Sequence, residues 1–227
     1  MNGGDTMCGR FTLTVGKDEL IDMFELVSFP DEYDPSYNVA PSQKVLAAVQ
    51  APNGRRAGFL QWGLVPFWVK DPKKWKPLIN ARAETLHKKP SFKHLVARRR
   101  CVIFADSFYE WSSRDGMRTP FRIFLKEEKP FAFAALWDRN EYGNEILTTC
   151  TIITTAPNEK VANVHDRMPV ILHDEAVEKW LNTERYSYNE VRNLLQPYPA
   201  EAMNLYPVST LVNSPKNNSP ECIVPVD

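Results

Sequence analysis

The runs Cys101-Val-Ile-Phe-Ala105 and Phe108-Tyr-Glu-Trp111 open the stretch of sequence that decides the fold. Both consist mostly of apolar, β-branched and aromatic residues, which are typical of strands. Three more runs of this kind follow closely, at Pro120–Leu125, Phe131–Leu136 and Leu147–Thr155. Glycine-containing turns at 114–116 and 142–144 separate some of these runs, so we predict strands that pair with their neighbours as antiparallel hairpins.

Outward from this block, the sequence predicts another hairpin and a few helices. Lys44–Gln50 and Arg56–Trp62 flank the turn residues Pro52-Asn53-Gly54, a strong hairpin signal. Phe11–Val15 is predicted to be a strand and Lys17–Leu26 a helix. Further helical segments are expected near residues 82–97, 157–163, 174–181 and 188–195. This order indicates the α+β class: a single β-rich domain whose mainly antiparallel sheet curls towards a barrel, with flanking helices.

The composition is that of one ordinary globular domain, with 227 residues of which 43% are hydrophobic and 25% charged. No apolar run approaches 18 residues, so we expect no membrane span. The first residues lack the basic and apolar regions of a secretory signal. The four cysteines form no C-x-x-C pair, which argues against a zinc site, and we expect neither a metal nor an organic cofactor. Unpaired cysteines are typical of a reducing cytoplasm.

Charge is unevenly distributed although the formal net charge is zero. Between Lys70 and Arg100, eleven Lys and Arg residues are opposed only by Asp71 and Glu84, so this stretch carries a charge of +9. The aromatic residues in or beside it are Trp62, Phe67, Trp68, Trp75 and Phe92. Positive charge that follows phosphates and rings that stack on bases are typical of a single-stranded nucleic-acid groove. A solvated basic face is the alternative, and the composition favours neither.

Cys8 lies in the run Met7-Cys8-Gly9-Arg10-Phe11, directly after a methionine. If Cys8 were the first residue of the mature chain, it would carry a free α-amine of pKa about 7.7–8.0 beside a thiol of pKa about 8.5. The amine can attack an aldehyde to form a Schiff base, which the thiol can close into a five-membered thiazolidine. The alternative is an ordinary cysteine near a chain end, and this run alone favours that interpretation.

Asn80 follows an apolar stretch in the segment 77–85, at a predicted strand-to-helix junction. The pattern favours a helix cap, which is the usual role of Asn at such a position. Alternatively, Asn80 presents its amide to a substrate while Arg82 reaches a phosphate.

Glu110 and His165 are candidates for acid–base chemistry. Alternation along the strand places Glu110 on the same side as Phe108, where apolar surroundings would raise its pKa and let it carry protons near neutral pH. The pattern alone slightly favours an exposed glutamate. His165 lies in Val164-His165-Asp166-Arg167-Met168-Pro169. It is either a general acid and base or, as the lone residue favours, a structural histidine.

Taken together, six segments of the chain resemble the SOS response-associated peptidase (SRAP) family, which includes bacterial YedK-like proteins. The segments are Met-Cys-Gly-Arg-Phe at 7–11, Tyr-Asn-Val-Ala-Pro at 37–41, Trp-Gly-Leu-Val-Pro at 62–66, Ile-Asn-Ala-Arg-Ala-Glu-Thr at 79–85, Phe-Tyr-Glu-Trp at 108–111 and Val-His-Asp-Arg-Met-Pro at 164–169. They occur in the family's order across residues 7–225. Each is a weak signal by itself, but the ordered set is highly specific and reverses the individual interpretations above.

The resemblance implies a protein of the DNA damage (SOS) response that binds single-stranded DNA and covalently traps abasic sites as a thiazolidine crosslink. It implies that Cys8 is the nucleophile and that Asn80 positions the sugar or the reacting nitrogen. Glu110 would move protons during imine formation, and His165 would act as acid and base in opening and closing the sugar ring. We expect a monomer in the cytoplasm, associated with the nucleoid, with abasic single-stranded DNA as its partner and no membrane contact.

The resemblance also implies a DNA-binding surface and a processed N-terminus. The residues expected to hold phosphates or to shape the DNA channel are Arg10, Arg82, Arg167, Trp62, Phe67, Trp68, Asn38 and Pro41. Residues 1–7 are expected to be a leader or extension, removed by autoproteolysis or non-native, ahead of a domain that spans residues 8–227. Two alternatives remain: a thiol peptidase that uses Cys8, His165 and Asn80, and a non-catalytic single-strand binder.

Overall fold

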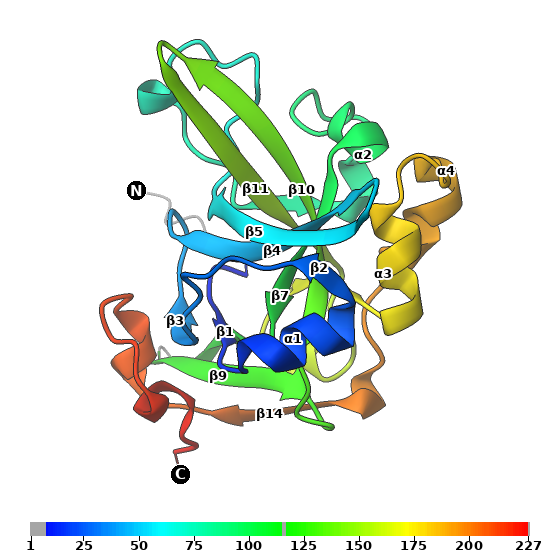
Figure 1. Cartoon of the computed structure of the whole chain (residues 1–227). Helices are drawn as coiled ribbons and strands as arrows, with labels where there is room; N and C mark the ends of the chain where they lie inside the picture. The colour runs from blue at the N-terminus through cyan, green and yellow to red at the C-terminus, as the bar shows by residue number, and fades with distance from the viewer. Residues whose placement is uncertain (1–7, 115–116, 227) are drawn as a thin grey trace.

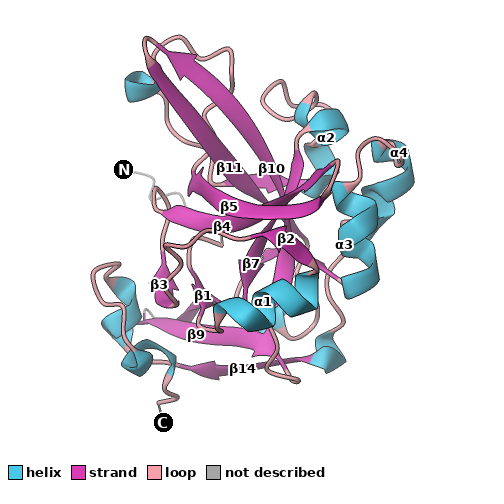
Figure 2. Ribbon diagram, viewed as in Figure 1, coloured by secondary structure: helices cyan, strands magenta, loops and turns pink. Residues whose placement is uncertain are grey.

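The backbone is built around a closed barrel of five strands in the computed structural model, which describes residues 8–114 and 117–226 (Figures 1 and 2). The strand order is β11 (Glu145–Thr155), β10 (Phe131–Tyr142), β7 (Arg100–Ala105), β4 (Lys44–Ala51) and β5 (Gly54–Trp62), with antiparallel neighbours. The ring closes where β5 runs parallel to β11, with Trp62 opposite Cys150. The predicted α+β fold, with a mainly antiparallel sheet curled into a barrel, is confirmed.

A second antiparallel sheet lies against one end of the barrel (Figure 1). Its strands follow the order β14 (Met203–Pro207), β9 (Met117–Leu125), β8 (Ser107–Arg114), β1 (Phe11–Leu13) and β3 (Ser36–Val39). Phe11 of β1 joins the two sheets, because its ring packs against Trp62 at 5.3 Å and Phe133 at 5.7 Å between ring centroids. The N-terminal strand is therefore an interior strand of this sheet and is covered by the barrel.

Strand β7 is buried along its whole length because it separates two hydrophobic cores. Ile103 points into the cluster inside the barrel, whereas Phe104 points to the cluster under the flanking helices. Helices α1 (Lys17–Phe24) and α3 (Asp174–Leu181) cover this outer face, and the Trp180 indole of α3 donates a 2.9 Å hydrogen bond to the Cys101 carbonyl. Their apolar side chains recur at helical spacing, which is why these segments are amphipathic helices.

Shorter elements connect this framework. The remaining strands are β2 (Leu26–Ser28), β6 (Asn80–Arg82), β12 (Met168–Pro169) and β13 (Ile171–Leu172), and the remaining α-helices are α2 (Leu95–Arg98) and α4 (Tyr188–Val191). Single 3₁₀ turns occupy Pro72–Lys74, Ala83–Thr85, Val161–Asn163, Arg192–Leu194, Ala200–Ala202, Thr210–Asn213 and Pro220–Ile223.

Two of the predicted helices are wrong in extent. The segment 82–97 is mostly turns and ends in the one-turn helix α2, because Pro90 lacks an amide hydrogen and interrupts any longer helix. The segment 157–163 forms only one 3₁₀ turn. There the Asn158 side chain accepts hydrogen bonds from the backbone amides of Lys160 and Val161, at 3.1 and 2.9 Å, and so stabilises a local turn in place of a helix.

Candidate active site and nucleic-acid surface

Cys8 lies three residues before the start of β1 and is almost completely buried, with 4% of its surface exposed. It borders a small cavity lined also by Phe108, Phe133 and Pro169. Its φ angle of 41° is in the left-handed region, which a residue with a side chain rarely adopts. Burial, followed by the nearby Glu110 carboxylate, raises the pKa of the Cys8 thiol well above its ordinary value. The thiol is therefore held in its neutral form.

Glu110 lies in the middle of β8 with 1% of its surface exposed. Burial raises the pKa of its carboxyl to about 7, although His165 and hydrogen bonds from the thiol and backbone N–H of Cys8 oppose the shift. The pattern-based interpretation as an exposed glutamate is wrong, because β8 is covered on both faces near this point. A carboxyl with this pKa exchanges a proton readily at neutral pH.

His165 completes a chain of contacts that begins at Cys8. Its Nε2 atom lies 3.9 Å from Oε2 of Glu110. The backbone amide of Arg167 lies 3.1 Å from Nδ1 and donates to it, which leaves the Nε2 side of the ring to face the carboxylate. The turn that follows Val161–Asn163 fixes this position, because the His165 amide donates to the Val161 carbonyl at 2.9 Å.

Asn80 approaches the same site from β6. Its side-chain Nδ2 lies 3.4 Å from the Cys8 carbonyl oxygen, and its backbone pairs with Ile152 of β11. The predicted helix cap is wrong, because Asn80 lies inside a strand and the following turn begins without a capping side chain. Within the described part of the chain, Asn80 Oδ1 and Glu110 Oε1 are buried acceptors without a hydrogen-bond partner. Two unsatisfied oxygens beside one nucleophile indicate room for a ligand that donates protons.

Arg167 and Arg82 lie near this cluster, but they differ in exposure. The Arg167 guanidinium donates two hydrogen bonds to Glu84, at 2.7 and 3.0 Å, and a third to the Thr154 carbonyl at 2.8 Å. These bonds lower the pKa of the Glu84 carboxyl. Arg82 lies at the end of β6 and is exposed. A phosphate bound by Arg167 would therefore have to share it with Glu84.

Arg10 and Pro41 line a polar pocket of about 330 Å³ beside the site, together with Gly9, Trp111, Arg118 and Asn213. Two guanidinium groups approach the Trp111 ring, Arg10 at 5.8 Å and Arg118 at 5.3 Å from its centroid. The sequence did not assign roles to Arg118 or Asn213, because neither stands in a recognisable motif. The alternation of side chains along β9 was the one sequence signal that could have pointed to Arg118 as a residue of this pocket.

Asn38 and Trp62 are corrections to the predicted DNA-contact residues, because both are buried. Asn38 is 1% exposed; it accepts a 2.8 Å hydrogen bond from Arg10 and donates to three backbone carbonyls of residues 212–217. Trp62 is fully buried in the barrel, and its indole donates to the Ile79 carbonyl at 2.9 Å. By contrast, Phe67 and Trp68 are 57% and 44% exposed. Asn38 holds Arg10 in place, and Trp62 is a core residue.

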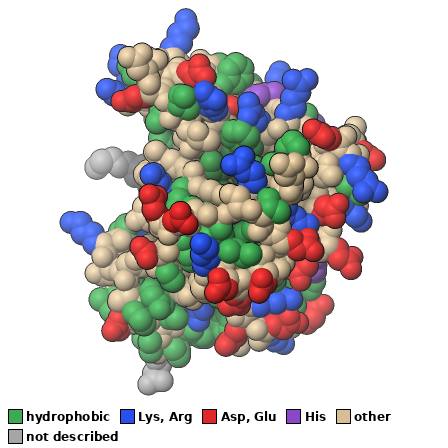
Figure 3. Space-filling model, viewed as in Figure 1, with side chains coloured by type: hydrophobic (Ala, Val, Ile, Leu, Met, Phe, Trp, Pro, Cys, Tyr) green, Lys and Arg blue, Asp and Glu red, His purple; other side chains and the backbone are tan. Residues whose placement is uncertain are grey.

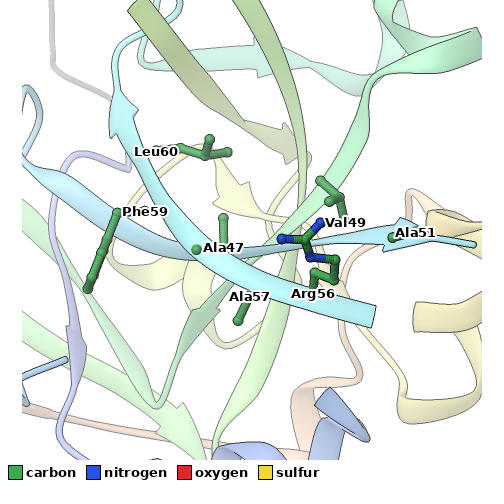
Figure 4. A pocket seen from close by; sticks show the side chains of 8 residues that line it. Ala47, Val49, Ala51, Arg56, Ala57, Phe59 and Leu60 are labelled. Atoms are coloured by element: carbon green, nitrogen blue, oxygen red, sulfur yellow. The ribbon is translucent and has the colours of Figure 1, made fainter. Parts of the chain in front are cut away.

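Another hollow, of about 230 Å³, lies over the β4–β5 hairpin (Figure 4). Small residues such as Ala47 and Gly58 leave this space between Val49 and Leu60, with Arg56 on its rim. None of the predicted site residues lines it. In residues 8–114 and 117–226 no helix is long and apolar enough to cross a membrane. The same residues contain no group of three or more His, Cys, Asp or Glu side chains arranged to hold a metal ion.

Comparisons with known proteins agree with this architecture. The family model described as SOS response associated peptidase (SRAP) matches residues 7–215. The chain is 52% identical over 221 residues to the abasic site processing protein YoqW of Bacillus subtilis (strain 168), covering 96% of this chain and 99% of that protein. It is 37% identical to the abasic site processing protein HMCES of Gallus gallus, over 86% of this chain and 67% of that one. A crystal structure of a Bacteroides thetaiotaomicron protein matches with a TM-score of 0.85 and 26% identity, covering 96% of this chain and 100% of that one.

Proposed function

Because the chain belongs to the SOS response associated peptidase (SRAP) family, we propose that it binds single-stranded DNA and traps abasic sites as a thiazolidine crosslink on Cys8. One observation carries the proposal: Cys8 and Glu110, both buried, lie in one cluster with His165 and Asn80, in which His165 Nε2 is 3.9 Å from Glu110 Oε2 and Asn80 Nδ2 is 3.4 Å from the Cys8 carbonyl oxygen. The amine and the thiol of Cys8 are the two groups that an aldehyde would have to meet. The names of the relatives support a substrate with abasic sites.

The chemistry requires a free amine at Cys8, so the reactive form of the protein begins at that residue. The amine attacks the C1′ aldehyde of the ring-opened sugar, and the resulting hydroxyl leaves as water after accepting a proton from Glu110. This leaves a protonated imine and an ionised Glu110; the thiol then adds to the imine carbon, and its proton returns to the Glu110 carboxylate. Aldehyde, amine and thiol thus yield a thiazolidine and one water. A pKa of about 7 suits both directions of proton transfer.

Asn80 and His165 would prepare the reacting groups. The free Oδ1 of Asn80 is an acceptor for the amine or for a sugar hydroxyl, and it is buried without a partner among the described residues. His165 would take the proton of the sugar C1′ hydroxyl as the ring opens and return a proton as it closes. Its contact with Glu110, at 3.9 Å, supports proton exchange between the two groups.

The DNA strand would follow the basic and aromatic surface around this site. Arg10, Arg82 and Arg167 would hold phosphates, with Pro41 at the channel wall. The exposed rings of Phe67 and Trp68 would stack on bases. We further propose that the functional domain spans residues 8–227, that residues 1–7 are removed by autoproteolysis, and that the protein acts as a monomer in the DNA damage (SOS) response of the cytoplasm. Residues 1–7 lie outside the residues that the structure describes.

A denaturing gel tests the central proposal. Protein verified by mass spectrometry to begin at Cys8 is incubated with a single-stranded oligonucleotide that carries one abasic site. We expect a crosslink that forms without borohydride, disappears in Cys8→Ala, and persists in Cys222→Ala, which removes another buried cysteine. Protein that retains residues 1–7 should form no such crosslink. Absence of the crosslink with the verified protein would refute the proposal.

A thiol peptidase of the Cys-His-Asn type has less support in this arrangement. Such an enzyme needs a thiolate activated by histidine. Here His165 contacts Glu110, and burial keeps the Cys8 thiol neutral. No observation in the site favours turnover of peptide substrates.

A further inference from the structure

A second pocket, of about 520 Å³, lies between α2, β10 and the loop that begins at Pro66. We call it the α2 pocket. Its lining residues are Phe67, His94, Leu95, Ala97, Arg98, Arg99, Asp138 and Arg139. Lys, Arg and His side chains gather on the corresponding upper part of the surface in Figure 3. None of Cys8, Asn80, Glu110 and His165 lines the pocket, and Phe67 is the one lining residue that it shares with the DNA surface proposed above.

The aromatic wall of the α2 pocket is fixed from below by buried polar residues. The Asp138 carboxylate, 3% exposed, accepts a 2.9 Å hydrogen bond from the Phe67 amide. Asn140 is fully buried and donates to the carbonyls of Pro66, Phe67 and Val69, at 2.8, 3.3 and 2.9 Å. Such convergent bonds hold the loop in one position. The backbone of Phe67 is thus held in place, with 57% of the residue's surface exposed and its ring in edge-to-face contact with His94 at 5.2 Å between ring centroids.

Three arginines provide the positive charge of the pocket. Arg99 stacks on Trp137 at 4.2 Å, which orients its planar guanidinium. Arg139 has an exposed contact of 3.2 Å with Glu141, and Arg98 has no ion pair or hydrogen bond within the described residues. The one carboxylate that lines the pocket, Asp138, is buried and already accepts from the Phe67 amide. The accessible surface is therefore cationic and lies beside an exposed ring.

We propose that the α2 pocket is a second DNA subsite, which stacks one unpaired base on Phe67 and binds its phosphate through Arg98, Arg99 and Arg139. The inference rests on the proposed DNA-binding function, which it extends to a place that the chemistry does not require. Asp138 pairs with Thr149 of β11, three residues from Ile152, which pairs with Asn80. Because an offset of three residues is odd, Thr149 and Ile152 point to opposite faces of the sheet, so a DNA strand bound at Cys8 has to pass around the edge of the sheet to reach the pocket.

Two features favour nucleic acid over an acidic peptide. Guanidinium groups match phosphate geometry, and exposed rings stack on any base. In addition, further positive charge is close in sequence to the lining residues: Lys70 follows Phe67 by three residues, Lys93 directly precedes His94, and both are exposed. A carboxylate-bearing peptide would use the charge but would leave the ring of Phe67 without a planar partner.

Fluorescence anisotropy with labelled 15-nucleotide and 5-nucleotide strands, each with a stable abasic analogue at its centre, tests the proposal. The variant Arg98→Glu/Arg139→Glu is compared with Lys126→Glu/Arg192→Glu, which changes net charge equally at exposed positions outside the pocket. We expect the first variant to bind the 15-mer at least ten-fold more weakly. Its salt slope should fall by about 1.4, because each phosphate contact on a single strand contributes about 0.7. The control and the 5-mer should show changes below two-fold.

A second variant keeps the charge and removes the ring. Phe67→Ala should weaken binding of the 15-mer about five-fold or more, with the salt slope unchanged, because stacking releases no counterions. Equal affinity of wild type and both pocket variants for the 15-mer would overturn the proposal. The proposal would also be overturned by a competition experiment in which a poly-glutamate peptide displaces DNA from wild type but not from Arg98→Glu/Arg139→Glu. These readouts do not need the crosslink, so failure of Cys8 to react is seen separately.

Discussion

Replacing Glu110 by glutamine should change the pH dependence of stability. The carboxyl has a pKa of about 7 in the folded protein against 4.5 ordinarily, and the main cause is burial. At 1.36 kcal/mol for each pKa unit, this difference corresponds to about 3 kcal/mol. Because the folded state holds the proton more tightly than the unfolded state, the cost of ionising Glu110 is absent below pH 4.5 and complete above pH 7. Wild-type stability therefore falls as pH rises through this range.

Urea unfolding at pH 5 and pH 8 measures this difference. Wild type should lose about 2.5 kcal/mol of unfolding free energy between the two pH values that Glu110→Gln does not lose, because glutamine cannot ionise and the unfolded carboxyl is already partly ionised at pH 5. Glu201→Gln, at an exposed position outside the site, serves as the control and should behave as wild type. If wild type and Glu110→Gln lost the same free energy, the carboxyl would not be buried with a raised pKa, and its assigned role in proton transfer would lose its basis.

Four further predictions concern the site and its surroundings. Asn80→Ala should slow crosslinking at least ten-fold while the fold is retained, as measured by single-turnover gel assays. Cys8→Ser should keep the amine but lose the thiol, so its adduct with abasic DNA should survive a denaturing gel only after borohydride reduction. Trp62→Phe should cost about 2 kcal/mol in unfolding free energy through its lost hydrogen bond without weakening DNA binding. Trp68→Ala should do the reverse: stability unchanged within about 0.5 kcal/mol, and affinity lowered about five-fold or more.

The local elements of the fold could be predicted from the sequence because their signals are local. The hairpin of β4 and β5 follows from Pro52-Asn53-Gly54, and α3 follows from helical spacing around Trp180. The closure of the barrel had no such signal, because β5 and β11 pair in parallel across almost ninety residues of sequence. No sequence feature near Trp62 marks it as the residue at which the barrel closes. Because Trp62 lies beside a basic stretch, the sequence suggested that its side chain is on the surface.

The candidate site, too, could be predicted only in part from local sequence signals. The contacts of Glu110 needed the tertiary structure, because alternation distinguishes a buried from an exposed face only when one face of the strand meets solvent. Phe108, Tyr109 and Glu110 are all buried, so β8 is covered on both sides at this point. Asn80 looked like a cap because the segment after it was predicted to be a helix. The structure has only a single 3₁₀ turn of three residues there, which needs no capping side chain. The resemblance of ordered motifs found these residues, although it assigned surface roles to Asn38 and Trp62, which are buried.

The interior position of β1 has a practical meaning for anyone who handles this protein. Chain ends normally fray, but here Phe11 is paired on one side with Val39 and on the other with Phe108. Arg10 is also tied to the carbonyl of Val212 near the opposite end of the chain. A chain that starts at Cys8 would therefore have its first residue anchored at once, without any rearrangement of the domain. The proposed chemistry needs a free amine at Cys8, so an affinity tag is better placed after Asp227 than at the N-terminus.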